Sequence, residues 1–382
     1  MKAGPKRSLD LGGRIAEQRK AVGMKVNQLA ELVGVSRNTI TNWEAGRTEV
    51  NASDLLKISR ALGCDFMELL GVLPMTPPPR FAFRAHKRLR EDPELLATAR
   101  RLCYAYLDIE EIAGKRLTNV LPRHPFNPEK VDWEEYVEGI ADLVRERCKF
   151  HEMGPGRIPE TLESVGVRCL FFSTEGEGLD GISTVFQSMP LILLRTRETG
   201  IERTIFSAAH ELGHLVLHPH LFVEEPGDNE DGRDYEREAN HFAGCFLVPK
   251  CDLLRVWDEY SLEGLSTLHA LMILKSVFEV SIHCLFHRTK KLGLCKREYP
   301  AFIAELKSLL GIKGKANMSD LEPAPLAPET LQRTTRFERL VRSAYLQEEI
   351  SVAKVAEMFQ IPVEDAVKLT YKWVKPDVAL VA

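Results

Sequence analysis

The chain lacks the features that would place it in a membrane or in a disulfide-stabilised class of protein. It has no run of about eighteen apolar residues, and its start has no apolar segment followed by a small-residue cleavage site. We therefore expect a cytoplasmic protein with no membrane partner. Eight cysteines are present, but no two of them form a CxxC pair, which argues against a disulfide framework and against a zinc ribbon. Reduced, mostly buried thiols are expected.

Neither sign of charge dominates the chain. Its 382 residues carry 51 Lys and Arg against 55 Asp and Glu, a net charge of -4. This near balance neither indicates nor excludes nucleic-acid binding, because binding depends on where the charge lies. The first 71 residues carry 11 basic against 8 acidic side chains, so that segment alone is positive.

Proline and glycine divide the chain at two places. Residues 74–79 read PMTPPP, where three consecutive prolines favour polyproline II and exclude helix. Residues 311–328 are rich in Gly, Lys and Pro and have little to bury. We therefore expect the following parts: an N-terminal domain (1–72), a Pro-rich linker (73–80), a helical connector (81–155), a central domain (156–310), a second linker (311–328) and a helical C-terminal subdomain (329–382).

The central domain changes character along its length. Three short β-branched and aromatic runs, VRCLFFS, GISTVF and LILLR, are separated by turn sequences and predict a small three-stranded sheet. From about Glu202 to His218 the helical pattern returns, and Pro219 ends it. The expected fold class is mainly α (α+β): a five-helix N-terminal domain, an α+β domain with this sheet and helix, and a helical C-terminal subdomain.

The N-terminal domain contains the layout of a helix-turn-helix. NQLAELVG is followed by VSRNTITNWE, with Gly34 at the turn and Ser36 as the N-cap of the second helix. This stretch, which ends in WEAGR, resembles the XRE (phage-repressor-like) family of DNA-binding domains. The resemblance implies a double-stranded DNA operator as partner, a second helix that enters the major groove, and a homodimer on paired half-sites.

The resemblance also assigns roles to single residues. Arg and Asn pair bidentately with the edges of G and A respectively, and the residues in the base-reading positions are Arg37, Asn38 and Asn42. Flanking polar residues hold phosphates in such domains, and the candidates here are Asn27, Gln28 and Arg47.

Residues 210–220 read HELGHLVLHPH and contain an HExxH motif. On a helix this spacing places His210 and His214 on one face, where both imidazoles can reach one tetrahedral zinc ion. Glu211 is displaced by one position and can address water on the metal. A catalytic zinc site of this kind needs a third protein ligand, and that ligand must come from a residue outside the HExxH motif. His220 has metzincin spacing, but Leu217 stands where that motif needs glycine.

A second helical segment, EREANHFAGCFLVP, offers the other third ligand. A carboxylate from a second helix completes the His, His, Glu set of thermolysin-like enzymes, and Glu236 fits best. Asn240, one turn later, can orient a ligand histidine. Glu238 lies about 200° around the helix; it is expected to face solvent and is the lesser alternative. Two more histidines are expected to be packing residues: His218 and His241.

Together, HELGHLVLH and EREANHFAGCFLVP resemble the ImmA/IrrE family of zinc metallopeptidases, over roughly residues 160–295. The resemblance implies a gluzincin-like enzyme whose Zn²⁺ cofactor is held by His210, His214 and Glu236. Zinc in such a site lowers the pKa of its water to about 7. Glu211 then serves as the catalytic general base and returns the proton to the leaving amine.

The two resemblances in one chain predict a DNA-binding transcriptional regulator that cleaves a regulatory protein. The expected substrate is a repressor or similar regulator, cut in stress or mobile-element induction. Two alternatives stay open: a non-proteolytic transcription factor whose ImmA/IrrE-like domain senses a metal or ligand, and an antitoxin-like regulator of a toxin–antitoxin module. Glu211 argues against the first of these, because a sensory zinc site has no use for a base beside an open position.

The C-terminal segment ISVAKVAEMFQIPVEDAVKL has a helix-turn-helix cadence with a break at Ile361 and Pro362. Its second helix begins with the acidic residues Glu364 and Asp365, which oppose phosphates. A regulatory or packing role is therefore favoured over a second DNA-binding unit.

Overall fold

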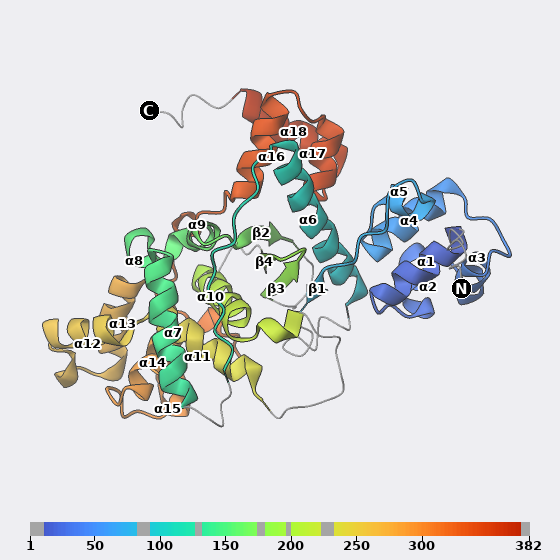
Figure 1. Cartoon of the computed structure of the whole chain (residues 1–382). Coiled ribbons are helices and arrows are strands. Elements are labelled where there is room, and N and C mark those ends of the chain that lie inside the picture. The colour runs from blue at the N-terminus through green and yellow to red at the C-terminus, as the bar shows by residue number, and fades with distance from the viewer. Residues whose placement is uncertain are drawn as a thin grey trace, which may run out of the picture. The chain divides into compact units, whose positions relative to one another are not determined.

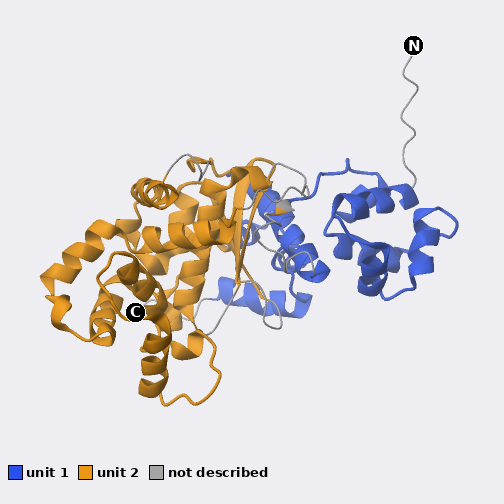
Figure 2. Ribbon diagram, turned by 90° about the horizontal axis from the view of Figure 1, so that it is seen from below, with its two compact units in different colours: residues 1–80, 86–115, 340–382 blue, residues 81–85, 116–339 orange. Residues whose placement is uncertain are grey.

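The computed structural model (Figure 1) is divided into two compact units, which Figure 2 shows in blue and orange. Unit 1 contains residues 1–80, 86–115 and 340–382, and unit 2 contains residues 81–85 and 116–339. The residues that the structure describes are 11–81, 92–126, 132–173, 180–195, 200–222 and 233–375. The predicted fold class, mainly helical with a small sheet, is confirmed.

The N-terminal part of unit 1 consists of the five predicted helices: α1 (Leu11–Ala21), α2 (Val26–Val33), α3 (Arg37–Glu44), α4 (Ala52–Leu62) and α5 (Phe66–Leu70). Their apolar faces meet in one core, in which Ile15, Leu29 and Ile40 are fully buried. Gly34 ends α2 in the left-handed region with φ 78°, where glycine has no steric cost. The Ser36 hydroxyl accepts a hydrogen bond from the Thr39 amide at 3.1 Å and so caps α3.

The rest of unit 1 is built around α6 (Pro93–Ile112). This helix contacts α4 of the N-terminal domain and α17 (Val352–Phe359) near the end of the chain; α18 (Val363–Val374) packs on α17. Arg100 of α6 is buried and donates from Nη2 to the Val22 carbonyl at 3.1 Å. The connector expected over 81–155 is therefore two elements, because α6 belongs to unit 1 and α7 (Trp133–Arg147) to unit 2.

Unit 2 contains the three predicted strands: β2 (Arg168–Phe172), β3 (Gly181–Phe186) and β4 (Met189–Arg195). β2 runs parallel to β4 with Cys169 opposite Ile192, and β3 runs antiparallel to β4 with Ser183 opposite Ile192. The two-residue β1 (Arg80–Phe81) adds a fourth strand in the order β1-β3-β4-β2. β1 is too short to show any periodicity in the sequence.

The helix α10 (Ile201–Leu217) is the central element of unit 2. It contacts β3 and β4 on one side and α11 (Tyr235–Leu247) on another, and α7 covers α11. Gly213 lets α10 and α11 approach closely, since a Cβ there would lie 3.3 Å from the Ala239 Cα.

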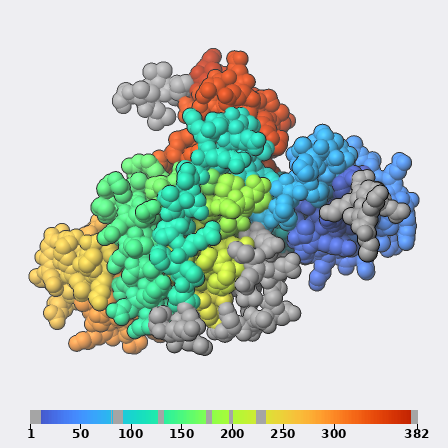
Figure 3. All heavy atoms as spheres, in the orientation of Figure 1, coloured from blue at the N-terminus to red at the C-terminus, as the bar shows by residue number. Residues whose placement is uncertain are grey.

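Further helices complete the unit: α8 (Phe150–Met153), α9 (Ile158–Ser164), α12 (Lys250–Glu259), α13 (Thr267–Phe278), α14 (Ile282–Lys291) and α15 (Tyr299–Leu309). α16 (Arg336–Leu346) spans the boundary between the units. Figure 3 shows α7, in green, at the surface of unit 2.

Within the described ranges, no single helix is long and apolar enough to cross a membrane. The pair α13 and α14 meets that criterion together by length and composition, with a bend of 111° between the two helices.

Residues 311–328, expected to be a linker, pack against unit 2. Leu321 is 2% exposed and Glu322 is 8% exposed. The Lys275 ammonium on α13 is buried between two carboxylates, Glu202 and Glu322, at 2.7 Å from each. Proline and glycine content indicated an irregular backbone correctly, but it gave no sign of this long-range ion pair.

Replacing Lys275 by Met is expected to destabilise the chain by about 3–5 kcal/mol, because two carboxylates are left buried without their cation. Urea denaturation followed by circular dichroism measures this loss. The triple variant that also carries Glu202→Gln and Glu322→Gln should recover part of it. The control Lys290→Met breaks the exposed pair with Glu298 and should cost under about 1 kcal/mol; equal effects at both lysines would contradict the prediction.

Candidate metal centre and DNA interface

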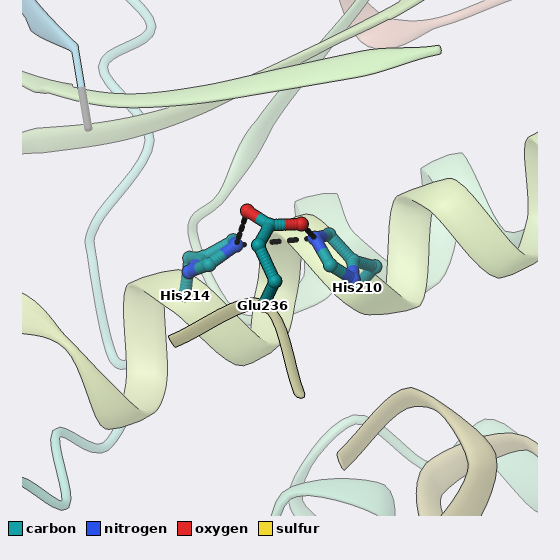
Figure 4. Close-up of side chains that lie close together, drawn as sticks. All are labelled: His210, His214 and Glu236. Carbon is teal, nitrogen blue, oxygen red and sulfur yellow. Dashed lines mark hydrogen bonds and ion pairs between the residues drawn. The ribbon is translucent and has the colours of Figure 1, made fainter. Parts of the chain in front are cut away.

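The HExxH motif lies in the C-terminal half of α10, where the helix is buried. Figure 4 shows two of its residues, His210 and His214, together with Glu236. His210 and His214 are one turn apart on the same face, and their Nε2 atoms are 3.1 Å from each other. Glu211 lies next to them and is 2% exposed. The apolar residues on either side of the motif anchor the helix against β3 and β4, so the two imidazoles have fixed positions.

Glu236 reaches this pair of histidines from the first turn of α11. Its Oε2 lies 3.4 Å from His210 Nε2, and its Oε1 lies 3.5 Å from His214 Nε2. One ligand atom from each of these three residues lies within 4.8 Å of the other two. His220 is not part of this group; its Nε2 is 3.2 Å from the Tyr235 hydroxyl.

The protonation states of this cluster suit a cation. Burial lowers the pKa of His214 to about 3, so its imidazole is neutral at physiological pH. Burial alone would raise the pKa of Glu236, but its contacts with His210 and His214 outweigh this and lower that pKa below its ordinary value. Two imidazole nitrogens and one carboxylate are the donor set of catalytic zinc sites with an open fourth position. The residues present therefore fit zinc.

A second layer of polar side chains holds the two histidines. His210 Nδ1 donates to the Asn240 Oδ1 at 3.0 Å, which leaves Nε2 free of a proton for a metal. His214 Nδ1 lies 3.0 Å from His218 Nδ1, and His218 Nε2 lies 2.8 Å from a Glu238 oxygen. One set of proton positions satisfies the whole chain: His214 donates to His218, and His218 donates to the carboxylate.

Glu238 corrects an expectation from the sequence. It was expected to face solvent, but it is 5% exposed, and Arg233 Nε donates to its Oε1 at 3.1 Å. The reason is that His218, at the C-terminal end of α10, and Arg233 both contact this carboxylate and enclose it. His218 is thus a partner of a candidate ligand, and its position four residues after His214 was the available signal. The Nε2 atom of His241 lies 3.0 Å from the Glu134 carbonyl oxygen.

The Glu211 side chain, on α10, lies beside Gly181, the first residue of β3. A Cβ placed on Gly181 would be 3.0 Å from the Glu211 Cγ and 3.5 Å from its Oε1, so only glycine leaves this carboxylate its present space. Gly181 was not among the site residues predicted from the sequence. Its position at the first residue of a predicted strand, after a Gly-rich turn, was the only signal.

The residues predicted to contact DNA lie on α2, on α3 and just after α3. Arg37 and Asn38 are exposed in the first turn of α3, and Asn42 is half-buried one turn later. Asn27 and Arg47 are exposed. The Gln28 Oε1 accepts a hydrogen bond from the Lys25 amide at 2.8 Å and thereby caps α2. Arg37 and Asn38 thus lie at the N-terminal end of the second helix of the motif, the end that faces base edges in helix-turn-helix domains, whereas Asn42 lies near its C-terminal end.

Comparison with known proteins finds a family match for two parts of the chain. Residues 15–69 match the family model described as helix-turn-helix, and residues 162–290 match the M78 peptidase model, described as IrrE N-terminal-like domain. The chain joins a helix-turn-helix domain to an IrrE-like peptidase domain. The XRE and ImmA/IrrE resemblances are thereby confirmed. The helix-turn-helix domain corresponds to α1–α5, and the IrrE-like domain extends from α9 to α14.

The helix-turn-helix domain also has a curated relative. It is 41% identical over 54 residues to repressor protein C2 of Salmonella phage P22. The similar stretch is 14% of this chain and 25% of the repressor, so the chain matches about a quarter of the length of that relative.

Proposed function

We propose that this chain is a transcriptional regulator that binds operator DNA through the helix-turn-helix domain and cleaves a regulatory protein through the IrrE-like domain. One observation carries the peptidase half of the proposal: a buried carboxylate, Glu211, lies next to a His, His, Glu donor set, and three donors would leave a bound zinc ion one open position. A site that only stores or senses a metal does not need that carboxylate.

Zinc would be held by His210, His214 and Glu236, and when bound it would supply a Lewis acid for the scissile carbonyl and lower the pKa of water. Glu211 would accept the proton of the attacking water and pass it to the leaving amine. Asn240 and His218 would keep the two imidazoles in the tautomer that leaves each Nε2 without a proton.

The substrate we propose is a repressor or a similar regulator encoded beside this chain, whose cleavage releases transcription. The test is incubation of the purified, zinc-loaded chain with each neighbouring gene product, followed by mass spectrometry of the products. A defined cut that a chelator prevents supports the proposal. Operator affinity that responds to zinc, with no cut in any neighbour, would instead support the non-proteolytic sensor.

The DNA half of the proposal predicts different effects for two arginines. Arg37→Ala should weaken binding to the selected operator by about 1–3 kcal/mol and relax the sequence preference at one base pair. Arg47→Ala should weaken specific and non-specific DNA equally and reduce the salt slope by about one. Electrophoretic mobility shifts on an operator selected from random DNA measure both effects, with Lys57→Ala on α4 as the charge-matched control.

A loss of the same size for all three variants would show that net charge alone matters. In that case the assignment of Arg37 as a base reader would be wrong.

A further inference from the structure

The helix α18 has more exposed large apolar side chains than any other helix in the described ranges. Four of its side chains are of this kind, with exposed fractions that run from 48% for Val363 to 62% for Tyr371; the other two are Val367 and Val374. Outside α18, no described helix has more than two. A contiguous apolar patch on a surface indicates an interaction site.

The four side chains form one continuous stripe along α18. They follow one another at spacings of four, four and three residues, which places them within about 80° around the helix axis. Another side of the helix is held by the core of the subdomain: Trp373 is buried, and its ring lies 6.0 Å from that of Tyr345 and 6.2 Å from that of Phe359. The stripe therefore stays at the surface as long as the subdomain is folded.

The stripe does not have the chemistry of a DNA-reading surface. Helices that read DNA present polar and basic side chains to base edges and phosphates, whereas this surface of α18 is apolar. The helix-turn-helix cadence of α17 and α18 thus leaves a surface that fits an apolar partner.

The charges beside the stripe have opposite signs at the two ends of α18. Glu364 lies in the first turn, and Lys375 directly follows the last residue of the helix. The two are eleven residues apart, about three full turns, so they lie on the same flank of the stripe. Lys375 Nζ is 5.4 Å from the centre of the Tyr371 ring, which places this charge next to the apolar surface. Both charged side chains are exposed.

A second copy of α18 in the antiparallel orientation complements this pattern. With the two stripes centred on each other, Val363 of one copy faces Val374 of the other. In the same register Glu364 faces Lys375 of the second copy. A two-fold axis makes each of these pairs occur twice, as an interface between identical subunits requires. A parallel pair would instead bring like charges together.

We propose that the α18 stripe is the surface through which two copies of this chain associate, as an antiparallel pair of helices. The resemblance of the N-terminal domain implied a homodimer without naming its surface, and α18 lies at the other end of the chain. A pair of helices of twelve residues each is a small interface, and interfaces below about 1,200 Å² form weak, transient complexes. We therefore expect dissociation in the micromolar range.

Association through α18 would tether two helix-turn-helix domains. α18 packs on α17, and α6 contacts both α17 and α4 of the N-terminal domain, all within unit 1. Two tethered domains would bind paired half-sites more tightly than either domain alone, because the second contact becomes intramolecular. This consequence rests on the proposed DNA binding, but the association itself does not.

Sedimentation equilibrium of the full chain without DNA, from low to several hundred micromolar, measures the association. Val367→Glu places a carboxylate in the middle of the stripe and should weaken association by about 100-fold or more, because an apolar interface offers a buried charge no partner. Val277→Glu is the matched control: it makes the same change at a residue of α13 that is 43% exposed and lies in unit 2, and it should leave association unchanged.

The flanking charges provide a second test that leaves the apolar stripe intact. Glu364→Lys places a lysine opposite Lys375 of the other copy, twice in each dimer, and should weaken association by about 5- to 30-fold, since exposed ion pairs are individually weak. Lys375→Glu should have a similar effect. An equimolar mixture of these two variants should associate as strongly as the unmodified chain, because both flanking pairs of the mixed dimer then join a lysine to a glutamate.

Three outcomes would overturn the inference. A chain that stays monomeric at every concentration would assign the stripe to another occupant, such as the residues that follow Lys375 or a different protein. Association that Val367→Glu leaves unchanged would place the dimer interface elsewhere. A mixture of the two charge variants that associates no better than each alone would contradict the antiparallel pairing. Thermal melting followed by circular dichroism checks that every variant is folded.

These measurements fail separately from the proposed function, because neither operator DNA nor a cleavable protein is present. A monomeric chain that binds its operator and cleaves a neighbour would contradict only the α18 dimer. A dimer that Val367→Glu dissociates, but that binds no DNA, would keep the α18 interface and contradict the DNA half of the proposed function.

Discussion

Replacing Glu211 by Gln is expected to reduce cleavage by about 10²- to 10⁴-fold, the usual contribution of a general base. The amide has the size of the carboxylate and fits the same space beside Gly181, but it cannot accept a proton from water. Its neighbours His210 and His214 keep their positions, so zinc content should remain at the unmodified level. Initial cleavage rates and zinc content by plasma mass spectrometry measure the two quantities on one preparation.

Two comparisons make this result specific. Glu160→Gln on α9 removes a carboxylate that pairs with Arg157 near the surface, and it should leave cleavage unchanged. Operator binding by the Glu211→Gln chain should also be unchanged, because the helix-turn-helix domain has its own core. Equal cleavage by Glu211→Gln and the unmodified chain would show that this carboxylate is not the base.

The part of the candidate metal centre that could be predicted from the sequence is the part set by local geometry. In an α-helix a spacing of four places two side chains on one face, so His210 and His214 could be paired without knowledge of the fold. Glu236 could be proposed because α11 follows α10 closely in the chain. How α11 is rotated about its axis depends on tertiary packing, which is why Glu238 was wrongly expected in solvent.

The same limit applies to unit 1. The apolar periodicity of α6 and α17 showed that each helix buries one face, but a periodic pattern does not name the partner of that face. α6 contacts both α4 and α17, which are separated by most of the chain. Residues 329–382 could therefore be predicted as helical, but their grouping with the N-terminal domain could not.

We expect zinc affinity to fall by different amounts when a direct candidate donor is removed and when a more distant hydrogen-bond partner is changed. Glu238→Gln should lower zinc affinity by about 10- to 100-fold, the usual effect of removing a partner of a ligand histidine. Its amide no longer holds the negative charge that His218 and Arg233 contact, so the chain of hydrogen bonds to His214 is weakened. Glu236→Ala removes a direct donor and should cost more than Glu238→Gln. Competition with a chromophoric chelator gives both affinities.

A buried carboxylate elsewhere in unit 2 provides the control for this series. Glu163 is 6% exposed and pairs with Arg339 at 3.0 Å, so Glu163→Gln makes the same chemical change without contact with the histidines, and its zinc affinity should equal that of the unmodified chain. Circular dichroism of each apo variant checks that the fold is retained. A larger loss for Glu238→Gln than for Glu236→Ala would make Glu238 the third ligand, with His218 as part of the zinc site and Glu236 as a neighbour of it.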